Sequence, residues 1–309
     1  MRPTLAFIAG DPGGIGPEIA VKAMRERAVR RACRPVAVGP RAVFLRAGWR
    51  PGLAPLVDWG TRGRFPHRPT AAGGRLSYEI FRRCMHLSAR GIIDGMVTGP
   101  VSKEAWRQAG TAQPDQTALI CAETGAPETG MMLLGDGLRA VLVTRHIPLR
   151  RVARALDAAA IGKAARQACR AIRELLGVSR PHMGLCALNP HAGEGGLIGD
   201  EERSLLAPAA AGLRRRGLRC AGPLPADAAW AAHAAGRFDV LLALYHDQAM
   251  VPLKLRAGRS VVNWTIGAPV LRTAPGHGTA YDIAGRGTAD PAGMIAAALL
   301  AAKIARKRG

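Results

Sequence analysis

The chain has 309 residues, of which 48% are hydrophobic. This length favours two α/β domains over one large core, and the apolar content is enough to fill both. The formal net charge of +22 is typical of proteins that bind nucleic acids, so this class has to be considered. The arginines are scattered among alanines, however, and no aromatic residue interleaves with the basic clusters at residues 214–216 and 303–308 to stack bases. We therefore expect no nucleic-acid partner and interpret the positive field as an attraction for small anionic ligands.

Two further features bear on where the protein works. No run of about 18 uncharged apolar residues occurs, and the apolar residues 5–9 pass directly into a loop of Gly and Pro. The six cysteines are widely separated and form no C-x-x-C pair. The sequence predicts a cytoplasmic protein with no membrane partner, whose cysteines are reduced and mostly buried.

Apolar runs of strand length alternate with longer helical patterns along the chain, which is typical of parallel βαβ units. Residues 50–74 are rich in Pro, Gly and Arg and are expected to form an irregular surface excursion. We expect two α/β/α domains that flank a cleft, one formed by residues 1–100 plus 256–309 and the other by residues 101–255. In chain order, the expected elements are a strand at 5–9, a helix at 17–31, a strand at 36–38, a helix at 77–90, strands at 96–98, 131–134 and 139–143, a helix at 158–176, a strand at 183–188, helices at 201–216 and 227–235, a strand at 240–244 and a helix at 291–305.

The first loop, residues 10–18, has the sequence Gly-Asp-Pro-Gly-Gly-Ile-Gly-Pro-Glu between an expected strand and an expected helix. Its spacing is not G-x-G-x-x-G, and the next strand ends at Gly39 with no acidic residue to hold a ribose hydroxyl. Glu18 already occupies the positive end of the following helix, where a phosphate would bind. We interpret this loop as a tight scaffold turn and not as the cofactor site.

Three histidines, His146, His191 and His246, each follow an apolar run and lie in a polar or Gly/Pro-rich loop. Neutral imidazole is a common ligand of zinc and similar divalent ions, and three protein ligands leave one coordination position open for a substrate. On spacing alone, three ordinary polar residues at strand ends remain the alternative.

Several motifs together resemble, in the same order, those of the 4-hydroxythreonine-4-phosphate dehydrogenase family. They lie at residues 10–18, 98–100 with Lys103, 144–148, 188–196, 222–227 and 245–248, so that the resemblance covers nearly the whole chain. It implies a fold similar to isocitrate and isopropylmalate dehydrogenases, NAD or NADP as cofactor, and a homodimer that shares its active sites between subunits. It also implies that His146, His191 and His246 hold one divalent ion, such as zinc, magnesium or cobalt. Residues 101–255 would then form the metal, substrate and dimerisation domain, and the other domain would carry the cofactor.

The resemblance also places substrate contacts on Lys254, Asn263 and Arg272. Lysine and arginine suit phosphate and carboxylate groups, arginine through bidentate pairing. Residues 115–118 read Asp-Gln-Thr-Ala, where the vitamin-pathway enzymes of the family typically read Gly-His-Thr-Glu. Thr117 is thus retained as a substrate contact, and Gln116 replaces a histidine. The implied substrate is 4-phosphohydroxythreonine, and another acidic β-hydroxy compound, such as a dihydrodiol carboxylate or a sugar-acid phosphate, is the alternative.

A last motif, residues 277–287, resembles the cofactor loop of isopropylmalate and isocitrate dehydrogenases. The resemblance implies that His277, Gly278, Ala280 and Asp282 contact the adenosine part of the cofactor. The alternative is a Gly-rich loop that only caps the fold.

The implied reaction is oxidation of a β-hydroxy acid followed by loss of carbon dioxide, in which a divalent ion lowers the pKa of the substrate hydroxyl. Asp247 either orients a ligand imidazole or accepts a proton. Lys103 and Lys254 are the other candidates for acid–base work. A metallohydrolase with the same three histidines is an alternative class, but a hydrolase has no use for a nucleotide loop.

Overall fold

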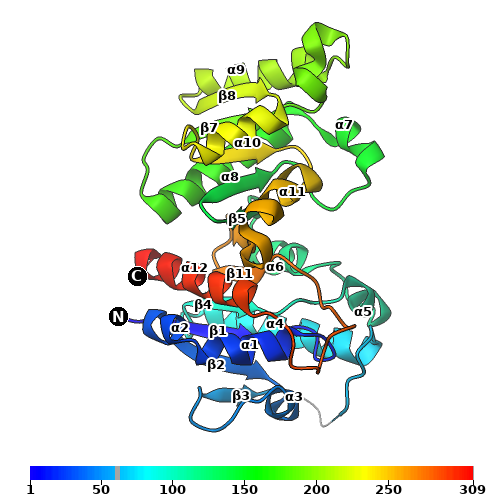
Figure 1. Ribbon diagram of the computed structural model, residues 1–309, viewed down its shortest axis with the longest axis vertical. Coiled ribbons are helices and arrows are strands. Elements are labelled where there is room, and N and C mark those ends of the chain that lie inside the picture. The colour runs from blue at the N-terminus through cyan, green and yellow to red at the C-terminus, as the bar shows by residue number, and fades with distance from the viewer. Residues whose placement is uncertain (60–62, 309) are drawn as a thin grey trace. The chain divides into compact units, whose positions relative to one another are not determined.

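The computed structural model describes residues 1–59 and 63–308 (Figure 1). The chain forms two compact α/β units, Met1–Pro127 with Arg259–Gly309 and Glu128–Gly258. The first unit therefore contains both the blue and the red ends of the ribbon in Figure 1. The expected α/β class is confirmed.

The sheet of the first unit has the order β3-β2-β1-β4-β11-β10. All neighbours are parallel except β10 and β11, and β1 and β4 are almost entirely buried, as parallel strands covered on both faces are. The strands are β1 (Thr4–Ile8), β2 (Arg34–Gly39), β3 (Leu56–Asp58), β4 (Gly95–Thr98), β10 (Val262–Ile266) and β11 (Arg272–Pro275). The helices are α1 (Gly16–Arg25), α2 (Arg27–Ala32), α3 (Arg41–Arg46), α4 (Ala71–Ala89), α5 (Lys103–Gln108), α6 (Gln116–Thr124) and α12 (Ala292–Arg308), and the short 3₁₀ turn η4 spans Gly258–Ser260.

Helices α4 and α5 of the first unit pack closely against each other. Trp106 is fully buried in the core of the first unit, and its indole Nε1 donates to Ser77 Oγ at 2.9 Å. A side chain at Gly74 would collide with the carbonyl of Ala105. Residues 101–127 therefore pack with the first unit, whereas we expected the second domain to begin at residue 101.

The second unit has the sheet order β5-β6-β9-β7-β8, in which only β5 and β6 are antiparallel. Asp136 and Gly137, both with positive φ, make the tight turn between these two strands. The strands are β5 (Gly130–Gly135), β6 (Leu138–Leu142), β7 (His182–Cys186), β8 (Arg219–Leu224) and β9 (Val240–Ala243). The helices are η1 (Leu149–Arg151), α7 (Val152–Ala155), α8 (Ala158–Leu176), η2 (Pro190–Gly196), the π-helix η3 (Glu202–Leu206), α9 (Ala207–Arg215), α10 (Ala226–Ala234) and α11 (His246–Ala257).

Several expected elements differ from the observed ones. The helix expected at 17–31 is two helices, because Glu26 has an extended backbone (ψ 130°) between α1 and α2. The expectation of an irregular segment at 50–74 is wrong where β3 pairs with β2 and where α4 begins, and residues 60–62 of that segment lie outside the described residues. All six cysteines are free, and five are buried. No helix in the described part of the chain is long and apolar enough to cross a membrane.

Candidate active site

The three histidines follow three neighbouring strands of the second unit. Strand β9 pairs in parallel with β6 on one side and with β7 on the other. The carboxyl ends of these strands therefore lie at one edge of the sheet, where open α/β sheets bind their ligands. His146 follows β6, His246 follows β9 and His191 follows β7.

The loops that carry His146 and His246 are bonded to each other. Thr144 is buried, and its hydroxyl and its backbone N–H both donate to the carbonyl of Leu244, at 2.6 and 3.1 Å. The rings of His146 and His246 consequently lie with their centroids 5.5 Å apart and their planes at 39°. The Nδ1–H of His246 donates to Asp247 Oδ1 at 2.6 Å. This contact leaves Nε2 of the neutral ring as a lone-pair donor, which is the tautomer that binds a metal ion.

The loop with His191 is held in an unusual backbone conformation. His191, Ala192 and Glu194 all have positive φ (51°, 56° and 42°), a region that non-glycine residues seldom occupy. The carboxylate of Glu202 fixes the start of this loop, because it accepts from the N–H groups of Leu188 and Asn189 at 2.8 and 2.7 Å. Burial alone would raise the pKa of Glu202, but these bonds and the Asn189 side-chain amide lower it. The sequence did not point to Glu202, because its partners are backbone groups that only the fold brings near.

The donor set fits part of a divalent metal site. The structure brings His146 and His246 together. Within the described part of this single chain, no three His, Cys, Asp or Glu side chains group as a potential metal site, and His191 does not join the pair. Imidazole is a ligand that zinc and similar ions prefer, and a carboxylate that orients one ring is a common partner of such a ligand.

The first unit contains a buried cation, Arg272, at the start of β11. Its guanidinium donates to the hydroxyls of Thr98 and Thr265 at 3.0 and 3.3 Å, and to the amide oxygen of Gln116. Burial lowers the pKa of Arg272 to about 10, and the nearby charge of Asp115 acts in the opposite direction. The side chain therefore stays charged at neutral pH, and its hydrogen-bond partners among the described residues are all neutral. A buried charge of this kind is stabilised when an anionic ligand binds.

Gln116 is the first residue of α6, and it is buried next to Arg272. The preceding Asp115 caps the helix by accepting from the N–H of Ala118 at 2.9 Å. The amide oxygen of Gln116 accepts from both Arg272 and Thr98, but its Nε2 is buried with no acceptor among the described residues. A ligand oxygen at this place would satisfy the amide.

The other expected substrate and acid–base residues are found in both units. In the first unit, Thr117 is buried beside Gln116, and Asn263 on β10 has a buried amide oxygen with no donor in the described structure. Lys103 is exposed at the first position of α5. Asp247 and Lys254 both lie on α11 of the second unit and are exposed.

The expected cofactor loop is fixed to the first loop of the same unit. The N–H of Ile15 donates to the carbonyl of Thr279 at 2.9 Å, and the hydroxyl of Tyr281 donates to Asp11 Oδ2 at 2.8 Å. Burial raises the pKa of Asp11, although its hydrogen bonds from Gly13 N–H and Tyr281 partly offset that effect. The first loop thus acts as a scaffold for the expected cofactor loop.

Within the cofactor loop, the four expected contact residues lie close together along the chain. His277 donates from Nδ1 to the carbonyl of Gly278 at 3.1 Å, and Gly278 has open space where a side chain would be. Ala280 has a positive φ of 42°, and Asp282 is exposed. A loop that is both fixed and open on its outer side can accept a flat ligand.

Comparisons with known proteins identify the family of the chain and agree with its fold. Residues 51–301 match the family model of the pyridoxal phosphate biosynthetic protein PdxA. The chain is 38% identical, over 98% of its length and 97% of the relative, to 4-hydroxythreonine-4-phosphate dehydrogenase of Erythrobacter litoralis. Its fold matches the crystal structure of 4-hydroxythreonine-4-phosphate dehydrogenase from Klebsiella pneumoniae with a TM-score of 0.86 and 34% identity, covering 99% and 98% of the two chains. A terephthalate 1,2-cis-dihydrodiol dehydrogenase from Burkholderia xenovorans matches with a TM-score of 0.64 and 34% identity, covering 96% of each.

The two α/β units and these matches define an enzyme of the dehydrogenase class. The chain belongs to the PdxA family of pyridoxal phosphate biosynthetic proteins.

Proposed function

We propose that this chain oxidises 4-phosphohydroxythreonine with NAD or NADP and a divalent metal ion, and that the oxidised product then loses carbon dioxide. The observation that carries the proposal is the buried Arg272, which has no carboxylate partner among the described residues, in a chain whose relatives are named for a phosphorylated hydroxy acid. We further propose that the protein works in the cytoplasm as a homodimer whose subunits share the active sites.

In this proposal the substrate is bound by Arg272 and by two buried amide atoms, of Gln116 and Asn263, that have no partner among the described residues. The guanidinium of Arg272 holds an anionic group of the substrate through two parallel bonds. The Nε2 of Gln116 donates to an oxygen of the same substrate, and Thr117 lies beside it. Asn263 accepts from a hydroxyl or ammonium group through its unpaired amide oxygen.

His146, His191 and His246 are the residues that would hold the metal ion, be it zinc, magnesium or cobalt. When bound, such an ion lowers the pKa of the substrate hydroxyl and stabilises the negative charge that develops as carbon dioxide leaves. By accepting from Nδ1, Asp247 favours the tautomer of neutral His246 in which Nε2 carries the lone pair. Lys103 and Lys254 are the candidate groups for moving protons.

The cofactor lies along the loop that contains His277, Gly278, Ala280 and Asp282. The fixed backbone of this loop provides a surface for the adenosine part, and the exposed carboxylate of Asp282 is available to ribose hydroxyl groups.

The test is a substrate panel. The purified chain is incubated with NAD or NADP and each divalent ion in turn, and reduced nicotinamide and released carbon dioxide are both measured. We expect 4-phosphohydroxythreonine to give both signals. If no acidic β-hydroxy compound gives either signal with any ion, the proposed reaction is wrong.

A second substrate class is favoured by Gln116, which stands where the vitamin-pathway enzymes have a histidine, and by the likeness to a dihydrodiol dehydrogenase. A dihydrodiol carboxylate therefore belongs in the panel. A higher kcat/KM for this compound than for 4-phosphohydroxythreonine would assign the chain to the alternative.

A further inference from the structure

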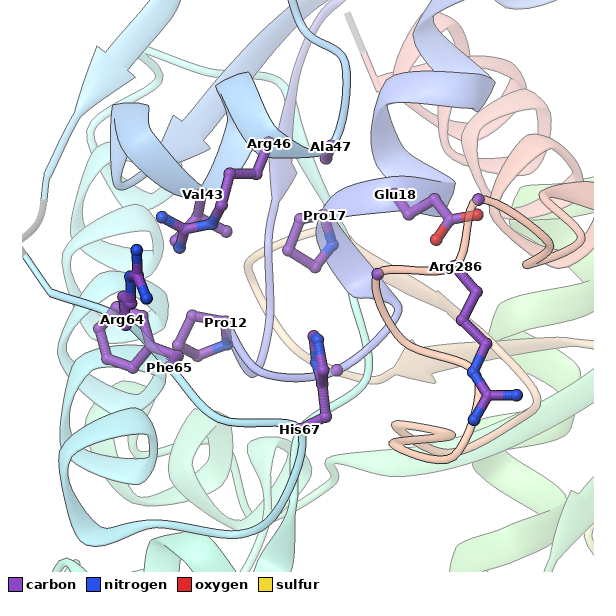
Figure 2. Close-up of a pocket in the computed structure, with 13 residues that line it drawn as sticks. Pro12, Pro17, Glu18, Val43, Arg46, Ala47, Arg64, Phe65, His67 and Arg286 are labelled. Atoms are coloured by element: carbon purple, nitrogen blue, oxygen red, sulfur yellow. The ribbon is translucent and has the colours of Figure 1, made fainter.

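A cavity of about 710 Å³ in the first unit is walled by the first loop and by residues 285–287, the last residues of the expected cofactor loop (Figure 2). Pro12 of the first loop and Arg286 of the cofactor loop both line it. This cavity therefore belongs to the cofactor site proposed above. A feature with no assigned role lies in the second unit, around the turn at residues 191–195.

Residues 191–195 form a left-handed turn, a conformation that chains of L-amino acids disfavour. Their φ angles are 51°, 56°, 77°, 42° and 68°, with ψ between 0° and 56°. Three of the five residues, His191, Ala192 and Glu194, are not glycine. Left-handed residues usually occur singly, because their Cβ atoms approach the following carbonyl oxygen too closely in a longer run. The left-handed turn therefore persists only if contacts from the rest of the unit hold it.

One buried carboxylate, that of Glu202, contacts the chain on both sides of His191. Before the histidine, Oε1 accepts from the N–H groups of Leu188 and Asn189 at 2.8 and 2.7 Å, and Oε2 accepts from the Asn189 side-chain amide at 2.9 Å. After the histidine, Gly193 packs so closely on the carboxylate that a side chain there would lie 2.7 Å from Oε2. Gly193 is the buried residue of the left-handed turn, so Glu202 holds the segment that carries His191 from both ends.

The hydrogen bonds of Glu202 are charge-assisted. Burial acts to raise the pKa of Glu202, but the bonds from Asn189 and Leu188 outweigh this effect and lower the pKa, so the carboxylate is charged at neutral pH. No lysine or arginine of the described residues pairs with it, and its charge is offset by the N–H groups of the loop. Glu202 is also the first residue of the π-helix η3, and π-helical turns are found frequently at functional sites.

The side chain of His191 is exposed, and within the described part of the chain it does not join the pair of His146 and His246. In the proposed shared site, His191 is the ligand that one subunit supplies to the pair in its partner. A ligand that is already fixed in its binding conformation loses little entropy when the ion binds, whereas a free loop has to be ordered at that moment. A preformed turn in the donating chain therefore favours metal binding.

We propose that Glu202 is a positioning residue of the metal site, which holds the left-handed turn and thereby presents His191 to the ion bound by the histidine pair of the partner subunit. This inference rests on the proposed function, because it needs a metal ion shared between subunits. It goes further by assigning a role to a residue that does not touch the ion and acts only on the ligand donated across the dimer.

The first test measures binding of Co²⁺ alone to the metal-free protein by equilibrium dialysis. Glu202→Gln keeps the size of the side chain, but it removes the charge and directs an amide donor at the amide donor of Asn189. We expect the Kd for Co²⁺ to rise roughly 10- to 100-fold, as is typical when a residue that orients a metal ligand is lost.

The matched control is Asp200→Asn, which removes a nearby exposed carboxylate that accepts from Arg203 and not from the loop of His191. Its Kd for Co²⁺ should equal that of the wild type. Thermal unfolding of both variants checks that the fold is kept.

The second test separates the positioning of His191 from a general structural role. Glu202→Gln is mixed with His246→Ala or with His191→Ala, subunits are allowed to exchange, and activity is assayed at a Co²⁺ concentration near the wild-type Kd. With His246→Ala, one site of the mixed dimer combines the intact pair of the Glu202→Gln chain with a well-placed His191, so about a quarter of the wild-type activity should return. With His191→Ala, no site has both, and activity should not return. A general loss of structure in the Glu202→Gln chain would prevent recovery in both mixtures.

The proposal is overturned if Glu202→Gln binds Co²⁺ as tightly as the wild type does, if Asp200→Asn loses as much affinity, or if the two mixtures recover equally or not at all. A reference mixture of His191→Ala with His246→Ala distinguishes this failure from that of the proposed function. If the reference mixture recovers, only the role of Glu202 is wrong. If the wild type binds no Co²⁺ or the reference mixture stays inactive, the shared metal site is wrong and the role of Glu202 is wrong with it.

Discussion

Replacing Gln116 by histidine tests the least usual feature of the substrate-binding residues. In the wild type, Gln116 Nε2 is a neutral donor buried beside the charged Arg272. A histidine at this place would accept from Arg272 with one ring nitrogen and donate to the substrate with the other. Its protonation is opposed by burial and by the guanidinium, and is favoured only when an anionic substrate is bound.

The expected gain is that of a charge-assisted hydrogen bond over a neutral one. This difference is about 1–3 kcal/mol, or roughly 5- to 150-fold in the KM for 4-phosphohydroxythreonine. The gain should grow as the pH falls below about 6.5, because burial and Arg272 move protonation of this imidazole below its ordinary range while a bound anion opposes that effect, and the wild-type amide does not titrate.

The assay compares kcat and KM of the wild type and Gln116→His at several pH values, with Gln108→His on the exposed face of α5 as the control for an added histidine. The reasoning is refuted if the wild type already reaches a kcat/KM of roughly 10⁴ M⁻¹s⁻¹ or more and the histidine variant does no better at any pH. The glutamine would then be a neutral replacement.

Three further predictions concern the metal, the cofactor and stability. His146→Ala should lose its bound metal on dialysis and nearly all of its activity, while its circular dichroism stays unchanged. Even the loss of a residue that only orients a metal ligand lowers metal affinity or activity roughly 10- to 100-fold. If the variant retains the metal, the site lies elsewhere. Tyr281→Phe removes the hydrogen bond to Asp11 and should raise the KM for NAD or NADP about threefold or more, while kcat changes little. An unchanged KM would mean that this hydrogen bond does not position the cofactor loop. Burial lowers the pKa of His233, whose Nε2 accepts from the N–H of Arg139. Below about pH 6.5, the unfolded chain therefore binds a proton at this residue more strongly than the folded chain does, and the free energy of unfolding should decrease. Urea titrations at several pH values should show a weaker pH dependence for His233→Gln than for the wild type.

The elements that the sequence predicted well have strong local signals. The helix expected at 158–176 is observed at those residues, because an amphipathic pattern lies between Asp157, which caps the first turn, and Gly177, which has the left-handed conformation at the end. The positions of His146, His191 and His246 after three apolar runs were also readable, since a buried parallel strand is a short apolar segment followed by a polar loop.

Other elements have no local signal. Strand β3 lies in a segment rich in Pro and Gly and forms only by pairing with the edge of β2. Strands β10 and β11 contain polar residues such as Asn263 and Arg272, and were not expected. The sequence places Gln116 and Arg272 more than half the chain apart, so their contact, and the resulting unsatisfied amide, follow only from the tertiary fold.

The placement of the histidines gives a last prediction, on the dimer. His146 and His246 lie together in one chain and His191 does not join them, so we expect the partner subunit to supply the missing ligand. His191→Ala and His246→Ala should each be inactive alone. When the two are mixed and allowed to exchange subunits, half of the dimers are mixed, and each has one site built only from intact ligands, so that about a quarter of the wild-type activity should return.

The matched mixture is His146→Ala with His246→Ala. Because both histidines belong to the same cluster in one chain, every site in their mixed dimer lacks a ligand, and no activity should return. Sedimentation of the mixtures confirms that dimers form. If activity returns in neither mixture, or if a monomer is fully active at micromolar concentration, each chain builds its metal site alone. If activity returns in both mixtures, His146 and His246 belong to different metal sites, although their ring centroids lie 5.5 Å apart.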